Sequence, residues 1–394
     1  MKQLPWPIRS MNAVGRCLLG GRPVPSLEPE ELLTKATRLT GLTDFLPDED
    51  FNQGLAVLCA SIEHDVKPTL LGRIALQQMI VRILCNRLLW IYWRNTAPQR
   101  FAGALLPPLI VIGLPRSGTT FLHRLLALDP AARAPMLWEL QRPFPALGHD
   151  RRRQQTQREI GMIHWLAGHL DTMHVTSADA VEECMLLLDT TMVSLSFWVM
   201  SPVYSYLDWW LARDKTHAYR IYLEHLLWLQ SQTPQARLTL KAPAHTGCLD
   251  ALLAAIPDAM IVQTHRDPAA ALTSANSLIS SIQRMATDAV DLPRMAEINV
   301  SMLLQLHQNS METRKQIGQE RIVDVHYDAF VNDPIGMIQN IYRHFNLEFT
   351  ADYADRLQVA LNNDGHTKRD RHRYHAEAYG QTDSELRQRY ARIR

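Results

Sequence analysis

The stretch Leu109-Ile-Val-Ile-Gly113-Leu-Pro-Arg-Ser-Gly-Thr-Thr120 decides the fold. It opens with a short β-branched and aliphatic run, bounded by Pro107-Pro108 and Gly113, which predicts a buried strand. Over residues 119–128 apolar side chains return at helical spacing, and Asp129-Pro130 closes that segment. The sequence therefore predicts a strand, a glycine-containing turn and a helix in immediate succession.

Three further short apolar runs, residues 238–240, 260–264 and 322–325, are each followed by a helical pattern. Strands that alternate with helices favour a parallel sheet with helices on both faces. We therefore expect an α/β protein with a P-loop-like three-layer fold around a central parallel sheet. Ligands of such sheets bind beyond the carboxyl ends of the strands, where the turn after Gly113 lies.

The regions around this α/β pattern read as mostly helical. Residues 68–88 carry apolar side chains at helical spacing, and residues 29–42 and 50–64 show weaker versions of the same pattern. We predict a helical N-terminal region over residues 1–104 and an α/β domain over residues 105–394. A helical insertion at about residues 140–231 of that domain is expected to form a lid.

Composition excludes several classes of function. The 394 residues include 41 lysines and arginines against 40 acidic residues, so the net charge of +1 provides no overall field for nucleic acid. Apolar residues make up 46% of the chain, but no run of eighteen is continuously apolar. We expect a globular protein with no nucleic-acid partner and no transmembrane segment.

The five cysteines are widely spaced and include no CxxC pair of the kind used for zinc or dithiol chemistry. The N-terminal stretch lacks the continuous apolar core of a secretory signal. Both observations favour a reducing compartment, and we expect a cytoplasmic protein. The sequence carries no signal of oligomeric state.

The spacing from Gly113 to Gly118 is that of a phosphate-binding loop, in which backbone N–H groups and a helix N-terminus face one anion. The lysine that nucleoside triphosphatases place after the second glycine is replaced by Thr119, and the loop cation is Arg116. Neither Asp324 nor Asp189 lies where a strand-end magnesium ligand is expected. A P-loop kinase is therefore the weaker alternative, and no metal site is predicted.

These residues resemble the 3′-phosphoadenosine 5′-phosphosulfate (PAPS)-dependent sulfotransferases, specifically the bacterial branch with a Pro-Arg-Ser-Gly-Thr-Thr loop. A second family motif is a strand followed by an arginine and, eight residues later, a serine; here it reads Ile261-Val-Gln-Thr-His-Arg266-Asp-Pro-Ala-Ala-Ala-Leu-Thr-Ser274. The resemblance extends over about residues 105–375. Two motifs in the right order, roughly 150 residues apart, are far more specific than either alone.

The resemblance implies PAPS as co-substrate, PAP (adenosine 3′,5′-bisphosphate) as product, and no required metal. The loop residues Arg116, Ser117, Gly118, Thr119 and Thr120 would hold the 5′-phosphosulfate. Arg266 and Ser274 would bind the 3′-phosphate, and Tyr327 would lie near the nucleotide. The basic stretch at residues 365–374 resembles the loop that closes over the nucleotide in this family.

In-line transfer of a sulfuryl group to a hydroxyl requires charge stabilisation and a proton acceptor. Two cations could neutralise charge on the leaving oxygen: Arg116 and Lys241. Lys241 matches a strand-end lysine of the family. Glu139 is the first choice for the base, because many family members place a catalytic glutamate at about this point, and Glu183 is the second. Three histidines rank lower as bases: His174, His245 and His123.

The acceptor is expected to be a hydroxylated small molecule, lipid or carbohydrate. Tryptophan and tyrosine side chains in the insertion favour a hydrophobic or ring-bearing acceptor, although aromatic residues at helical spacing are more often core. A non-catalytic protein that binds adenosine bisphosphate is the remaining alternative.

Overall fold

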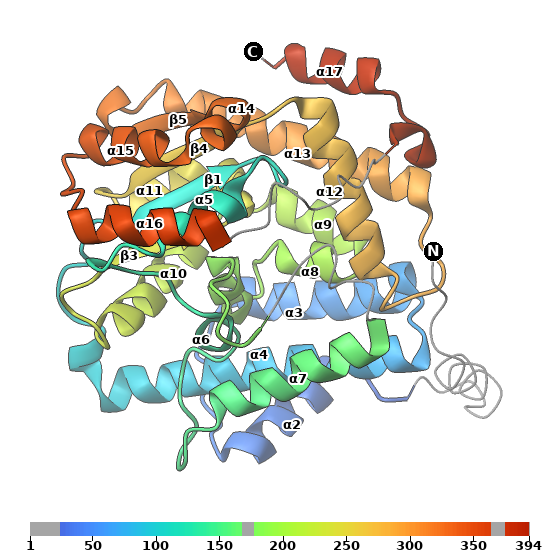
Figure 1. Ribbon diagram of the computed structural model, residues 1–394. Coiled ribbons are helices and arrows are strands. Elements are labelled where there is room, and N and C mark those ends of the chain that lie inside the picture. The colour runs from blue at the N-terminus through green and yellow to red at the C-terminus, as the bar shows by residue number, and fades with distance from the viewer. Residues whose placement is uncertain (1–23, 168–176, 364–374, 394) are drawn as a thin grey trace.

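The computed structural model describes residues 24–167, 177–363 and 375–393. At its centre is a sheet of five parallel strands in the order β2-β3-β1-β4-β5 (Figure 1). The strands are β1 (Leu109–Gly113), β2 (Ala132–Arg133), β3 (Arg237–Lys241), β4 (Met260–His265) and β5 (Ile322–His326). The four longer strands fall on the four apolar runs of the sequence, which confirms the α/β class. Strand β2 was not predicted, because two residues are too few to show a hydrophobic pattern.

Strand β1 lies in the middle of the sheet, and its side chains alternate between the two faces. Leu109 and Val111 pack into one hydrophobic cluster, whereas Ile110 and Ile112 pack into the other. All four side chains are fully buried, which explains why the run is continuously apolar. The predicted three-layer arrangement is therefore confirmed.

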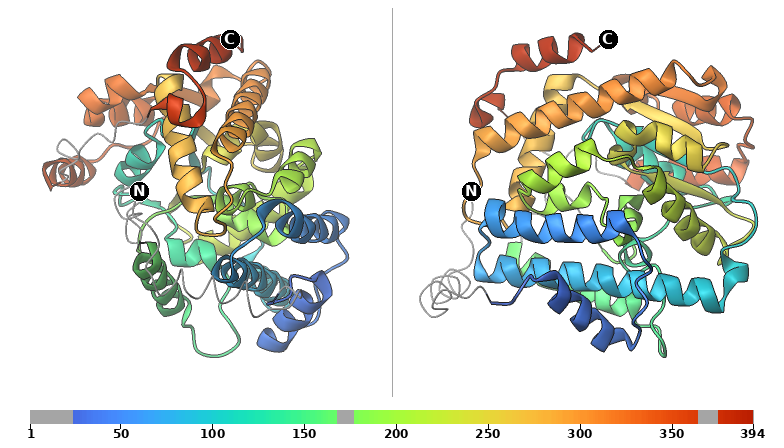
Figure 2. Two further views of the ribbon diagram at one scale, coloured as in Figure 1. Left: turned by 90° about the vertical axis from the view of Figure 1, so that its right-hand side faces the viewer. Right: turned by 180° about the vertical axis from the view of Figure 1, so that it is seen from behind.

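Each face of the sheet is covered by its own set of helices. The first face carries α5 (Thr119–Leu126), α14 (Tyr327–Asn332), α15 (Pro334–His344) and α16 (Ala351–Asn363). The second face carries α10 (Thr216–Gln230), α11 (Leu249–Ala255), α12 (Pro268–Gln283) and α13 (Leu292–Arg314). Seen from behind, α13 runs across this second side of the molecule (Figure 2).

The helices α2 (Pro29–Thr40), α3 (Glu49–Ser61) and α4 (Leu70–Thr96) form a layer on the side of the molecule away from β5 (Figure 1). Asp48 caps α3 by accepting a hydrogen bond from the backbone N–H of Phe51 (3.1 Å). Its other carboxylate oxygen pairs with the buried Arg87 of α4 at 3.0 Å. One carboxylate therefore fixes α3 against α4.

Helix α4 is long and apolar enough, by length and composition alone, to cross a membrane. In this structure it is a core helix that packs against α2 and the 3-10 helix η4 (Cys184–Thr191), and Leu84, Leu88 and Trp90 are buried. Burial in the protein interior accounts for its apolar composition.

The insertion at about residues 140–231 is mostly helical in its described residues, as expected. Besides η4 and α10 it contains α7 (Arg152–Ala167), α8 (Ser196–Met200) and α9 (Tyr204–Ala212), and α6 (Leu137–Gln141) enters it. Trp198, Trp210 and Trp228 are buried in the main core, which the N-terminal helices also share. The boundary between residues 104 and 105 and the role of the insertion as a lid stay predictions.

The C-terminal segment packs on α12 and α13 through η8 (Ala376–Tyr379) and α17 (Asp383–Ala391) (Figure 1). Arg387 donates to Asp267, the N-cap residue of α12, at 2.8 Å, and Arg389 pairs with Glu297 of α13 at 2.8 Å. The remaining short helices within the described ranges are η1 (Ile62–Val66), η2 (Pro98–Arg100), η5 (Pro243–Cys248) and η6 (Gln319–Arg321).

Candidate functional site

The turn between β1 and α5 has an uncommon backbone conformation. Gly113, Arg116 and Gly118 have φ values of 133°, 69° and 96°, a region that glycine enters readily and arginine enters only at a cost. Positive φ values at these positions curl the chain so that successive N–H groups can face one anion. The N-terminus of α5 adds partial positive charge. The turn has the backbone of an anion-binding loop.

Both glycines also permit close approach by residues from other elements. A Cβ atom at Gly113 would lie 2.5 Å from the carbonyl oxygen of Thr264 on β4. A Cβ atom at Gly118 would lie 2.8 Å from Cδ2 of the ring of Tyr327, the first residue of α14. Any larger residue would push the loop away from these neighbours, so glycine is required at both positions.

The loop hydroxyl groups have different environments. Ser117 is buried, and its Oγ lies 2.6 Å from the carbonyl oxygen of Leu114 and 2.5 Å from Oγ1 of Thr264. Its hydroxyl group therefore holds the loop to β4. Thr119 is buried at the start of α5, whereas Oγ1 of Thr120 lies 3.4 Å from Nζ of Lys241.

The two sequence motifs meet beside this loop. Nε of Arg116 donates to Oγ of Ser274 on α12 at 3.0 Å, and Nη1 of Arg266 donates to the carbonyl oxygen of Arg116 at 2.9 Å. The Arg266 guanidinium lies over the Tyr327 ring, 4.3 Å from its centroid. Arg116 from the turn after β1, Arg266 from just after β4, Ser274 of α12 and Tyr327 of α14 thus form one group. Its two guanidinium charges are suited to a polyanionic ligand.

Lys241, the last residue of β3, is fully buried on another side of the loop. Its Nζ donates to Oε1 of Glu183 at 2.8 Å, and the Glu183 side chain remains 31% exposed. Glu183, at the start of η4, therefore combines a buried cation partner with an accessible carboxylate. Such a carboxylate can accept a proton from a bound hydroxyl group.

Glu139 has different neighbours. Arg133 donates to one of its carboxylate oxygens, and the backbone N–H of Met136 donates to the other at 3.0 Å. The side chain is buried and caps the first turn of α6. The structure does not bring Glu139 into hydrogen-bond contact with the loop or with Lys241.

Two of the three histidine candidates, His123 and His245, also lie outside this group. Burial, with the nearby Lys241 charge, lowers the pKa of His123 to about 3, and Nε2 of His123 lies 3.2 Å from the carbonyl oxygen of Thr239. Burial likewise lowers the pKa of His245 to about 3. Both rings are fully buried. His174 and the basic stretch at residues 365–374, both singled out from the sequence, lie outside the residues that the structure describes.

The two aspartates considered for magnesium are engaged elsewhere. Burial opposes ionisation of Asp324, but hydrogen bonds from Arg314 and His265 hold the pKa of its carboxyl group below the usual range. Burial raises the pKa of Asp189 to about 6, and its Oδ1 accepts a hydrogen bond from Ser196 at 2.6 Å. In the described part of the chain, no cluster of three metal-binding side chains occurs.

Comparison with known proteins agrees with this geometry. The sequence profile of the sulfotransferase family matches residues 107–351. The chain belongs to the sulfotransferase family. The matched range includes both motifs, Lys241 and Tyr327. As a member of this family, the sulfotransferase transfers a sulfuryl group to a hydroxylated acceptor.

Mycobacterial sulfotransferases are among its relatives. The omega-hydroxy-beta-dihydromenaquinone-9 sulfotransferase Stf3 of Mycobacterium bovis is 25% identical over 291 residues, which cover 71% of this chain and 73% of the relative. The structure of sulfotransferase STF1 from Mycobacterium tuberculosis superposes with a TM-score of 0.77, at 28% identity, over 92% of this chain and 98% of that one. For STF9 from Mycobacterium avium the TM-score is 0.82, at 25% identity, over 94% and 97%.

Sequence reasoning missed Thr264 as a residue that supports the loop. Gly113 and Thr264 are paired in the parallel register of β1 and β4, and Thr264 lies two residues before Arg266. A hydroxyl-bearing residue near the end of the strand that precedes Arg266 was therefore the sequence signal that could have identified this loop contact.

Proposed function

We propose that this sulfotransferase takes its sulfuryl group from PAPS and transfers it in line to the hydroxyl group of an apolar acceptor. The observation that carries the proposal is the group formed by Arg116, Arg266 and Ser274 beside the loop. PAPS has a 3′-phosphate that ATP lacks, and this second set of cationic and hydroxyl donors is suited to it. The glycine conformations and the loop N–H groups are suited to the 5′-phosphosulfate.

The charges of the site support transfer without a metal. A sulfuryl group carries less negative charge than a phosphoryl group, so fixed side-chain cations and backbone N–H groups can replace magnesium. Arg116 and Lys241 are the cations assigned to charge that develops on the leaving oxygen. Because Lys241 is buried, its field is weakly screened and acts strongly on that oxygen.

We further propose Glu183, ahead of Glu139, as the base that accepts the acceptor's hydroxyl proton. The Glu183 carboxylate lies next to Lys241, and Lys241 lies next to Thr120 of the loop. Both oxygens of Glu139 already accept hydrogen bonds, and that side chain is buried. A base must lie within reach of the attacking hydroxyl group, and these contacts favour Glu183.

The acceptor class and the location of the protein are also proposals. The name of the relative Stf3 describes a sulfotransferase of an omega-hydroxylated dihydromenaquinone, which supports an apolar alcohol as the acceptor class to test first.

A cytoplasmic location is supported by Cys59, Cys85, Cys184 and Cys248, which are all free thiols.

Transfer is expected to persist without divalent cations. Purified protein is incubated with ³⁵S-labelled PAPS and a panel of long-chain and ring-bearing alcohols, in excess chelator or with added Mg²⁺. Labelled sulfate ester is expected to form at comparable rates under both conditions, because loop N–H groups and side-chain cations supply the charge stabilisation. Loss of transfer in chelator, restored by Mg²⁺, would instead favour a kinase-like mechanism.

A further inference from the structure

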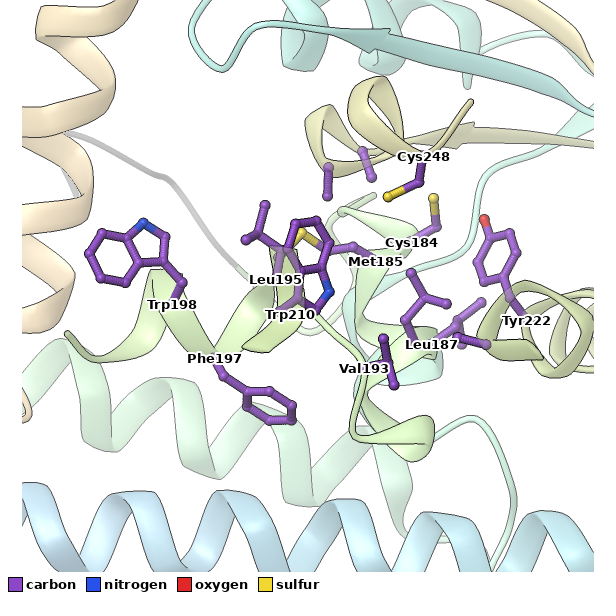
Figure 3. Packing of buried hydrophobic residues seen from close by; sticks show 14 of the residues in the cluster. Cys184, Met185, Leu187, Val193, Leu195, Phe197, Trp198, Trp210, Tyr222 and Cys248 are labelled. Atoms are coloured by element: carbon purple, nitrogen blue, oxygen red, sulfur yellow. The ribbon is translucent and has the colours of Figure 1, made fainter. Parts of the chain in front are cut away.

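A buried cluster of polar side chains lies behind the Lys241–Glu183 pair. It consists of Cys184, Tyr219, Tyr222, His245 and Cys248, all almost completely enclosed by the main core. Figure 3 shows Cys184, Tyr222 and Cys248 together at one end of that core, with the Tyr222 hydroxyl group turned toward Cys184. Buried polar groups are expensive unless they are satisfied, so the contacts within this cluster need an explanation.

His245 lies at the centre of the cluster and uses both ring nitrogens. Nδ1 of His245 lies 2.7 Å from the hydroxyl group of Tyr219, and Nε2 lies 3.3 Å from Sγ of Cys184. Burial keeps the ring neutral by lowering its pKa to about 3. A neutral imidazole has one donor and one acceptor nitrogen, so it can serve both partners at once.

These contacts join the two segments that carry the proposed base and cation. Cys184 directly follows Glu183, and His245 lies in η5, the 3-10 helix that begins two residues after Lys241. The Cys184 thiol also accepts a hydrogen bond from the backbone N–H of Lys241. The Cys184 side chain therefore ties the start of η4 to the last residue of β3 at the point where Glu183 meets Lys241.

Glu183 and Lys241 differ in how firmly their surroundings hold them. Glu183 precedes the first turn of η4, and its side chain is partly exposed, whereas Lys241 is fixed inside the sheet. Moving a catalytic group by about 1 Å from its productive position can lower the reaction rate on the order of 10²-fold. The segment that follows Glu183 must then be held as firmly as the strand that carries Lys241.

We propose that His245 is a positioning residue that, through Cys184, holds the Glu183 carboxylate against Lys241. The inference rests on the proposed roles of Glu183 and Lys241. His245 does not contact substrate; it supports the segment that does. Its neighbour Tyr219 fixes the orientation of the ring.

The test compares substitutions of His245 with a matched buried histidine. His245→Leu is expected to lower kcat by about 10- to 100-fold while the Kd for PAP changes by less than about twofold. His245→Gln, whose amide can reach Cys184 in place of Nε2, is expected to recover much of kcat. His225 is equally buried and hydrogen-bonded, to Thr190 and Ile221, and His225→Leu is expected to lower stability without this selective loss of kcat.

A double-mutant cycle with Glu183→Gln tests whether His245 acts through Glu183. His245→Leu is expected to lower kcat much less in the Glu183→Gln protein than in the native one. An equal loss in both, or wild-type kcat for His245→Leu, would overturn the positioning role and leave the proposed base intact. Full activity of Glu183→Gln would overturn the base and the positioning role together. If His245→Leu does not fold, Cys184→Ala in the same cycle decides between these outcomes.

Discussion

Replacing Glu183 with glutamine is expected to lower kcat by about 10² to 10⁴-fold and to leave the Kd for PAP nearly unchanged. The amide keeps the size of the side chain but cannot accept the hydroxyl proton. Lys241 also keeps a hydrogen-bond acceptor in place of Oε1. Single-turnover transfer of ³⁵S from labelled PAPS, alongside calorimetric titration with PAP, separates the two quantities.

Glu139→Gln is the matched control for this substitution. It weakens the contacts of Glu139 with Arg133 and Met136, so a lower melting temperature with nearly normal kcat is expected. The reverse result, with Glu139→Gln inactive and Glu183→Gln active, would restore Glu139 as the base. If both proteins bind PAP and keep full activity, neither carboxylate accepts the proton.

Replacing Arg266 with alanine is expected to weaken PAP binding by about 2 to 5 kcal/mol, because a bound 3′-phosphate would lose its charged partner. ATP binding, which involves no 3′-phosphate, should weaken much less. The substitution also removes the hydrogen bond to the carbonyl oxygen of Arg116, so some loss of loop order accompanies it. Titrating PAP and ATP into the native and the variant protein gives the loss of binding free energy for each nucleotide.

Arg343→Ala provides a charge-matched control, since Arg343 lies on α15 and hydrogen-bonds to Asn340. It should leave the preference for PAP unchanged. Equal weakening of PAP and ATP by Arg266→Ala would mean that Arg266 supports the loop rather than binds a 3′-phosphate.

The sequence predicted the parts of the site that depend on local pattern. The continuous apolar run at Leu109–Gly113 indicated a strand buried on both faces, and the glycines at 113 and 118 indicated the loop. The parallel register of β1 and β4 then brings Arg266 next to Arg116. These features follow from short segments whose hydrophobic period and glycine positions are visible without tertiary information.

The pairing of Lys241 with Glu183 was not predictable in the same way. The two residues are 58 positions apart, and α8, α9 and α10 lie between them. No hydrophobic period specifies which carboxylate meets a strand-end lysine across such an insertion. By contrast, a capping role for Glu139 in place of a catalytic one was foreseeable from the sequence. A glutamate in the first turn of a helix commonly binds free backbone N–H groups, as Glu139 does with Met136.

The shared interior of the N-terminal helices and the α/β part was also beyond sequence reasoning. Helical spacing predicted α2, α3 and α4, but their partners are set by packing between distant segments. The buried Arg87 of α4 is an example. Its guanidinium donates to the backbone carbonyl oxygen of Phe45 and to that of Thr190 in the insertion.

The preference for a 3′-phosphate is the central claim, and it can be measured on the native protein. Thermal unfolding is recorded with PAP, with ATP and with 5′-AMP at equal concentrations, since a ligand that binds only the native state raises its stability by mass action. PAP is expected to raise the melting temperature clearly more than ATP or 5′-AMP. Equal shifts with PAP and ATP would contradict the account.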